Sequence, residues 1–82
     1  MKCEYNDGMK VEYSDSLHVT MGDDVNVYVE QGYIAANIKH YLDKATSDND
    51  CGEIRKIAEA VTNTVGRKAC FCDIDSKACA NF

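Results

Sequence analysis

The sequence predicts an α+β fold in which two helices pack on one face of a four-stranded antiparallel meander. Three observations lead to this fold class: a repeat with period-two alternation through residues 6–29, two amphipathic helical patterns within residues 31–65, and a short apolar segment at residues 69–74. No linker separates these parts. We therefore expect a single domain over residues 1–82, stabilised by disulfides because so short a chain buries a small core.

The repeat is made of eight-residue blocks that begin at Asn6, Ser14 and Gly22. Each block has three turn-forming residues with an Asp at the centre, followed by five residues whose first, third and fifth side chains are apolar. Alternation at period two is typical of strands with one buried face. We predict strands at residues 2–5, 9–13, 17–21 and 25–30, joined by three-residue loops.

The loop length determines the register of this meander. The expected apolar pairs are Cys3–Val11, Val11–Val19 and Val19–Val27. The expected pairs on the opposite face are Glu4–Lys10, Glu12–His18 and His18–Tyr28. A two-residue turn at Asp7–Gly8 would mix the two faces, because a slip of one residue inverts a strand. Three-residue loops, with Gly8 in the left-handed region, keep all apolar side chains together.

After Glu30 the apolar residues take helical spacing. The first stripe predicts a helix at residues 31–46 and consists of Ile34, Ile38, Tyr41, Leu42 and Ala45. The second stripe predicts a helix at residues 51–65 and consists of Ile54, Ile57, Ala58, Val61 and Val65. Asp50 and Glu53 have the spacing of a capping box, and Gly66 ends the pattern. Residues 69–74 predict a short fifth strand.

Five cysteines in 82 residues favour an oxidising compartment and two disulfides. The disulfide candidates are Cys3, Cys51, Cys70, Cys72 and Cys79, of which one is left unpaired. Their spacing lacks the Cys-x-x-Cys pairs of zinc and redox sites, so we expect no metal and no cofactor. The pairing stays open, as does the odd cysteine, which could join another chain, be buried, or have lost its partner. A reduced cytosolic protein with buried thiols is the competing interpretation.

Charge and hydropathy exclude several classes of function. The net charge of −5, with nine scattered basic residues, argues against binding nucleic acid. No apolar run approaches the roughly 20 residues of a membrane span. The start Met1-Lys2-Cys3-Glu4 lacks the apolar segment of a signal peptide. The chain is therefore expected to be either cytosolic or a mature form with an added initiator Met.

Few side chains offer acid–base chemistry. His18 is expected on the polar sheet face near Glu12 and Tyr28, a layout found in small nucleases. Such a site needs an Arg or a second base, and both arginines, Arg55 and Arg67, lie on or beside the second helix. His40 is expected to face solvent. We therefore assign no catalytic residue and expect a protein that is not an enzyme.

The C-terminal cysteine pattern carries a family resemblance. The segment Cys70-Phe71-Cys72-Asp73 and the ending Lys77-Ala78-Cys79-Ala80-Asn81-Phe82, on a small proline-free chain, resemble small cysteine-rich effectors secreted by plant-pathogenic fungi. These include small members of paired effectors and overlap the killer-toxin-like group. The resemblance implies secretion, two or more disulfides, no catalysis and action through a protein partner.

These expectations combine into one functional hypothesis with two alternatives. The first is a secreted, extracellular, toxin-like or effector virulence factor that binds a protein, either another secreted effector or a host protein, with an intermolecular disulfide open to the odd cysteine. The second is a small acidic intracellular inhibitor of phage type that blocks a nucleic-acid-binding enzyme. The third is a ribonuclease-like enzyme centred on His18.

Overall fold

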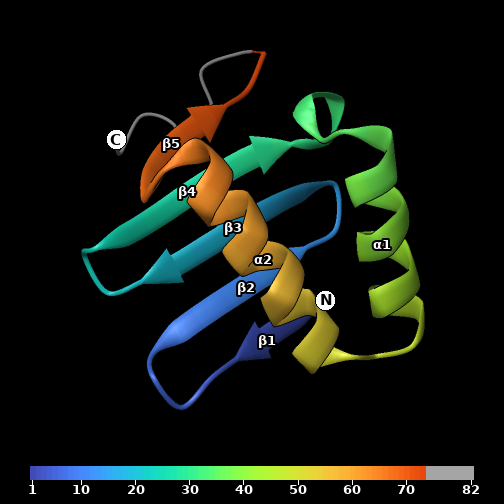
Figure 1. The fold of residues 1–82 in the computed structure, drawn as a ribbon, viewed down its shortest axis with the longest axis horizontal. Coiled ribbons are helices and arrows are strands. Elements are labelled where there is room, and N and C mark those ends of the chain that lie inside the picture. Colours follow the sequence, from blue (N-terminus) through green and yellow to red (C-terminus); the bar gives the residue numbers. More distant parts are fainter. Residues whose placement is uncertain (74–82) are drawn as a thin grey trace.

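The computed structural model describes residues 1–73, which form a five-stranded mixed sheet with two helices on one face (Figure 1). The strands lie in the sheet in chain order: β1 (Lys2–Glu4), β2 (Met9–Tyr13), β3 (Ser16–Met21), β4 (Val25–Glu30) and β5 (Lys68–Phe71). The helices are η1 (Gln31–Tyr33, a 3-10 turn), α1 (Ala36–Ser47) and α2 (Cys51–Val65). The predicted α+β fold is confirmed.

Strands β1 to β4 form the antiparallel meander in the predicted register. The paired residues include Cys3–Val11, Glu4–Lys10, Val11–Val19, Glu12–His18, Val19–Val27 and His18–Tyr28. The first loop closes as expected: the Tyr5 N–H donates to the Met9 carbonyl at 2.9 Å. Gly8 has a φ of 94°, a backbone conformation that residues with a side chain adopt only with strain.

The fifth strand runs parallel to β4, with Val27 opposite Ala69 and Val29 opposite Phe71. The chain leaves the end of β4, passes through both helices and re-enters the sheet beside the start of β4, which makes the pairing parallel. The strand was predicted at residues 69–74. It begins one residue earlier and ends at Phe71, and residue 74 lies outside the described part of the chain.

The first predicted helix, residues 31–46, is divided into two pieces. The η1 turn is followed by Ile34 and Ala35 in extended conformation, with ψ angles of 125° and 144°, before α1 begins. Gly32 is a poor helix former, and the chain turns here from the end of the sheet into the helical layer. Ile34 therefore lies in this connection instead of on the helical stripe.

The second helix has the predicted bounds. Asp50 Oδ1 accepts a hydrogen bond from the Glu53 N–H at 3.1 Å, which satisfies one of the free donors of the first turn. Gly66, with a φ of 100°, ends the helix and lets the chain turn toward β5.

The core lies between the helices and one face of the sheet. The largest fully buried side chains are Leu17, Leu42, Ile54, Val11, Val19 and Val27. They belong to one cluster that draws on the sheet and on both helices. We call this side of the sheet the covered face. The side chains that alternate with it form the uncovered face, over which Figure 1 shows no helix.

A set of contacts fastens the N-terminal hairpin to the start of α2. A disulfide joins Cys3 to Cys51 with a Cα–Cα distance of 5.7 Å, and the Tyr5 hydroxyl donates to the Cys51 carbonyl. The Arg55 guanidinium binds both carboxylate oxygens of Asp7 and lies 4.9 Å from the centre of the Tyr5 ring. The hydrogen bonds from Arg55 lower the pKa of Asp7 to about 2.

Candidate functional site

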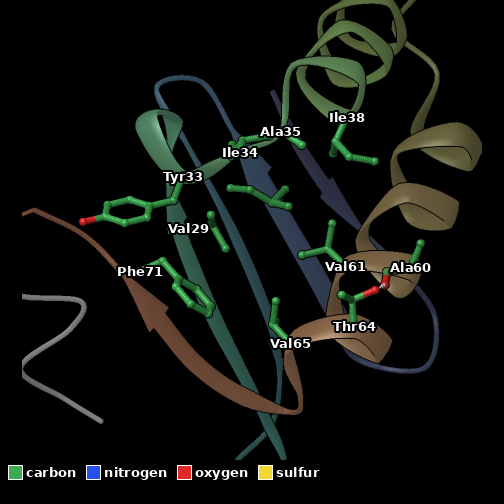
Figure 2. A pocket seen from close by; sticks show the side chains of 11 residues that line it. Val29, Tyr33, Ile34, Ala35, Ile38, Ala60, Val61, Thr64, Val65 and Phe71 are labelled. Carbon is green, nitrogen blue, oxygen red and sulfur yellow. Dashed lines mark hydrogen bonds between the residues drawn. The ribbon is translucent and has the colours of Figure 1, made fainter.

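The two helices diverge over the sheet and leave an opening at one end. They meet near the turn at residues 48–50, where Leu42 and Ala45 of α1 and Ile54 and Ala58 of α2 are buried. The start of α1 and the end of α2 lie farther apart (Figure 1). In this opening lies a cavity of about 390 Å³, which we call the apolar pocket (Figure 2).

Each wall of the apolar pocket comes from a different element. The side chains that define it are Leu17 and Val29 from the sheet, Ile34 and Ile38 from the start of the first helical region, and Val61 and Val65 from α2. Figure 2 shows Ile34 and Ile38 on one side of this space, Val61 and Val65 on another, and Val29 on the strand beside it. Because the walls lie on separate elements, the pocket depends on the whole fold.

The pocket presents little polar chemistry. No side chain that lines it is charged, within the part of the chain that the structure describes. The Thr64 hydroxyl donates to the Ala60 carbonyl at 2.9 Å, inside its own helix. The Tyr33 hydroxyl donates to Asp73 Oδ1 at 2.7 Å, and this bond raises the pKa of Tyr33. The walls therefore favour an apolar group.

Two exposed aromatic side chains form the rim of the pocket. Tyr33 is 49% exposed and Phe71 is 38% exposed, and their ring centres lie 6.3 Å apart. The Asp73 N–H donates to Glu30 Oε2 at 3.4 Å. Within residues 1–73, hydrogen bonds join two charged side chains to this rim, those of Asp73 and Glu30. Both are acidic.

A second hollow lies on the other side of η1. It has a volume of about 270 Å³ and includes Asp15, Tyr28, Glu30 and Gly32 in its lining. The Gln31 N–H donates to the Asp15 carbonyl at 3.1 Å, which holds the β2–β3 loop against η1. We call this the acidic hollow. Glu30 connects it, through Asp73, to the rim of the apolar pocket.

The structure places His18 where the sequence predicted, on the uncovered face. Its Nε2 lies 2.9 Å from Asn26 Oδ1, and its ring meets Tyr28 edge to face with centres 5.7 Å apart. Glu12 lies opposite His18 in the register, but no hydrogen bond joins the two side chains within residues 1–73. Asn26 and Tyr28 together fix the orientation of the imidazole.

The arginines lie away from His18. Arg55 projects from α2 on the covered face and is held by Asp7 and Glu59, its Nε lying 2.7 Å from Glu59 Oε1. Arg67 borders a hollow beside the end of α2. The sheet therefore separates both guanidinium groups from the imidazole. His40 is exposed on α1, as expected, with its ring 5.9 Å from that of Tyr41.

The disulfide candidates divide into two groups. Cys3 and Cys51 form a disulfide between β1 and α2. Cys70 and Cys72 lie at the end of β5 with their Sγ atoms 3.7 Å apart, longer than the roughly 2.05 Å of an S–S bond. Cys79 lies outside the described residues, so a second disulfide and one unpaired cysteine stay predictions.

Within residues 1–73, no three His, Cys, Asp or Glu side chains are grouped to hold a metal ion. None of the helices in that range has the length and apolar character to cross a membrane.

Comparison with known proteins finds no relative of this chain. Neither the protein-family models, nor the curated proteins, nor the solved structures include a match to this chain.

Sequence reasoning missed the apolar pocket. The pocket residues Ile34, Val61 and Val65 are apolar in the same way as core residues, so the pattern does not distinguish the two. The angle between two helices has no effect on a periodic sequence pattern. The one usable signal was Gly32-Tyr33 at the start of the first predicted helix, where a glycine and an exposed aromatic interrupt the stripe.

Proposed function

We propose that this chain is a secreted, non-catalytic protein that acts by binding another protein, in the manner of an effector or toxin-like factor. The observation that carries the proposal is the apolar pocket with Tyr33 and Phe71 exposed on its rim. Aromatic side chains are enriched at the centres of protein interfaces, where they exclude water and bury a large area. A partner that covers this rim would bury both rings and fill the pocket.

A protein partner fits this pocket better than a small molecule. Small-molecule sites combine apolar walls with a few well-placed polar groups that orient the ligand. Both hydroxyl groups that line this pocket, those of Thr64 and Tyr33, already donate elsewhere. A protein can supply its own orienting contacts outside the pocket, at the rim.

The disulfide supports the secreted part of the proposal. Cys3 and Cys51 are bonded across the core, and disulfides persist in oxidising compartments such as the extracellular space. The resemblance of the C-terminal cysteine pattern to secreted fungal effectors points the same way. The acidic intracellular inhibitor would instead keep its thiols reduced.

The uncovered face of the sheet supports the part of the proposal that the protein is not an enzyme. A ribonuclease-like site at His18 would need a second acid–base group and a cation for the phosphate. His18 is bonded to Asn26, while Arg55 is held on the opposite side of the sheet by Asp7. An RNA-cleavage assay on the wild type and on His18→Ala tests this directly, and cleavage lost in the variant would replace the proposal with an enzyme.

Site-specific photo-cross-linking tests the binding surface. A benzoylphenylalanine is placed at Phe71 in one variant and at Tyr41 in another. Tyr41 is the matched control because it is also an exposed aromatic, at 53%, but lies on α1 outside the pocket lining. We expect a discrete protein adduct from position 71, in medium and tissue of the producing organism or its host, and none from position 41. The same adducts from both positions, or none from either, would overturn the proposal.

Thiol counting tests the compartment. Intact mass before and after reduction should differ by two hydrogens for each disulfide in protein purified from its natural source. Five free thiols in that material would contradict secretion and favour the intracellular inhibitor.

A further inference from the structure

We propose that the partner's contact segment places an apolar side chain directly beside a Lys or Arg, so that the apolar group enters the apolar pocket and the cation meets Glu30, Asp73 and the acidic hollow. This inference rests on the proposed function and specifies the chemistry of the partner. It follows from the relation between two neighbouring surfaces, one without charge and one acidic.

The two surfaces adjoin through η1. Tyr33 belongs to the rim of the apolar pocket, while Gly32 and Glu30, within three residues of it, line the acidic hollow. Asp73 links the two, since its carboxylate accepts from the Tyr33 hydroxyl and its backbone N–H donates to Glu30. A group that fills the pocket therefore has carboxylates beside it as it crosses the rim.

The charges around this rim determine the sign of the partner. Asp73 and Glu30 are tied to the rim by hydrogen bonds, and Asp15 adds a third carboxylate in the acidic hollow. The chain as a whole carries a net charge of −5. Complementary charges select partners and speed association, whereas like charges placed together disfavour the wrong partner.

The same charges argue against a second copy of this chain as the occupant. Two copies that met through this rim would bring Glu30 and Asp73 of each copy together, with a net charge of −5 on both. Such an interface would need a cation from elsewhere on the surface to compensate. A basic partner segment supplies that cation next to its apolar anchor.

Two ten-residue peptides test the inference. Both carry Phe and Leu as anchors, and they differ only in the flanking polar positions, which are Lys in one and Glu in the other. Binding to the full chain is followed by the NMR amide shifts of Val29, Ile34 and Val61. We expect the Lys peptide to move these resonances and to bind about tenfold more tightly than the Glu peptide at low salt. The difference should shrink at high salt.

A pair of charge-reversed variants locates the effect. Glu30→Lys with Asp73→Lys should weaken the Lys peptide by about tenfold. Glu4→Lys with Glu12→Lys makes the same change in net charge on the exposed β1–β2 surface, away from the pocket lining, and should leave affinity within about twofold. An equal loss in both variants would show a general charge effect and overturn the inference.

The outcomes separate this inference from the proposed function. Equal affinity of the two peptides, with the pocket resonances shifted, overturns the basic partner while leaving protein binding at the pocket intact. If neither peptide shifts the resonances, the inference of a basic partner segment is also overturned. The cross-linking at position 71 then tests the proposed function by itself. Concentration-dependent self-association with the same resonances shifted would assign the pocket to a second copy.

Discussion

The two faces of the sheet differ in how they contribute to the molecule. On the covered face, Val11, Val19 and Val27 are completely buried, and the disulfide from Cys3 crosses to α2. On the uncovered face, alternating side chains meet in exposed ion pairs such as Lys10 with Glu4, at 3.9 Å. Burial and cross-linking thus concentrate on one face. The apolar pocket is the place where that face opens to solvent.

This difference is the reason for placing the proposed binding site on the covered side. The uncovered face can change its exposed charges with little effect on the free energy of unfolding, but it offers a partner no apolar depth. At the pocket, the divergence of α1 and α2 exposes part of the apolar layer, with Tyr33 and Phe71 beside it. The proposed partner would gain the free energy of burying the apolar surface that the fold leaves exposed there.

The largest expected difference is in the free energy of unfolding, when the same charge is introduced on the covered face or on the uncovered face. Val19→Asp places a carboxylate in the core, where Val11 and Val27 lie opposite it, and should cost about 4 kcal/mol or more, enough to unfold so small a domain. Thr20→Asp, one residue along, should change the free energy of unfolding by less than about 0.5 kcal/mol. Urea unfolding followed by circular dichroism measures both. Equal damage would mean that the two faces are not distinct.

The next effect comes from removing the cross-link of the covered face. Cys3→Ala with Cys51→Ala opens a link that spans 48 residues, which should cost about 4 kcal/mol by the loop-entropy relation. The matched change on the uncovered face is Glu4→Gln, which removes an exposed ion pair and should cost less than about 0.5 kcal/mol. If the double variant matched Glu4→Gln in its urea midpoint, the disulfide would be dispensable for stability.

A smaller difference is expected between two tyrosines. The Tyr13 hydroxyl on the covered face donates to Asp43 at 2.7 Å, so Tyr13→Phe should cost about 1 kcal/mol. The control, Tyr28→Phe on the uncovered face, removes the hydroxyl of a half-buried side chain and should be near neutral. Urea midpoints at pH 7 compare the two variants.

The same tyrosine makes a pH-dependent contribution. Burial, with the hydrogen bond to Asp43 second, raises the pKa of Tyr13 to about 12. Because the folded state favours the neutral phenol, this contribution is complete below pH 10 and is lost as the pH rises toward 12. Absorbance at 295 nm should show a tyrosine that titrates near pH 12 in the wild type and is absent from Tyr13→Phe. A titration unchanged by the substitution would contradict this assignment.

The sequence predicted the sheet better than the helical layer, for a physical reason. Three repeated blocks with an Asp-centred turn leave one register that keeps Val11, Val19 and Val27 on the same face, so pattern and pairing agree. A helical stripe identifies the buried side of a helix but not its angle to a neighbour. The divergence of α1 and α2 that forms the apolar pocket could therefore not be predicted from the helical pattern.

Contacts between distant parts of the chain also escaped prediction. Asp7 was read as a turn residue, and its ion pair with Arg55 joins positions 48 residues apart. The Cys3–Cys51 pairing was one of several that five cysteines allow. Each contact depends on where α2 crosses the sheet, which side-chain packing decides. Local propensity fixed the ends of α2 well because Asp50 and Gly66 act within one helical turn.

The smallest expected effect concerns ion pairs on the two faces at acid pH. Arg55 holds Asp7 toward the covered side and lowers its pKa from 3.8 to about 2, whereas Glu12 meets Lys2 at 3.7 Å on the uncovered face. Since the folded state favours ionised Asp7, its contribution to stability is complete above pH 4 and is lost as the pH falls to about 2. Asp7→Asn should therefore reduce the loss of the urea midpoint between pH 4 and pH 2, and Glu12→Gln should leave that loss unchanged. An equal acid response in both variants would mean that the Arg55 contact gives the hairpin no more support than an exposed pair gives the open face of the sheet.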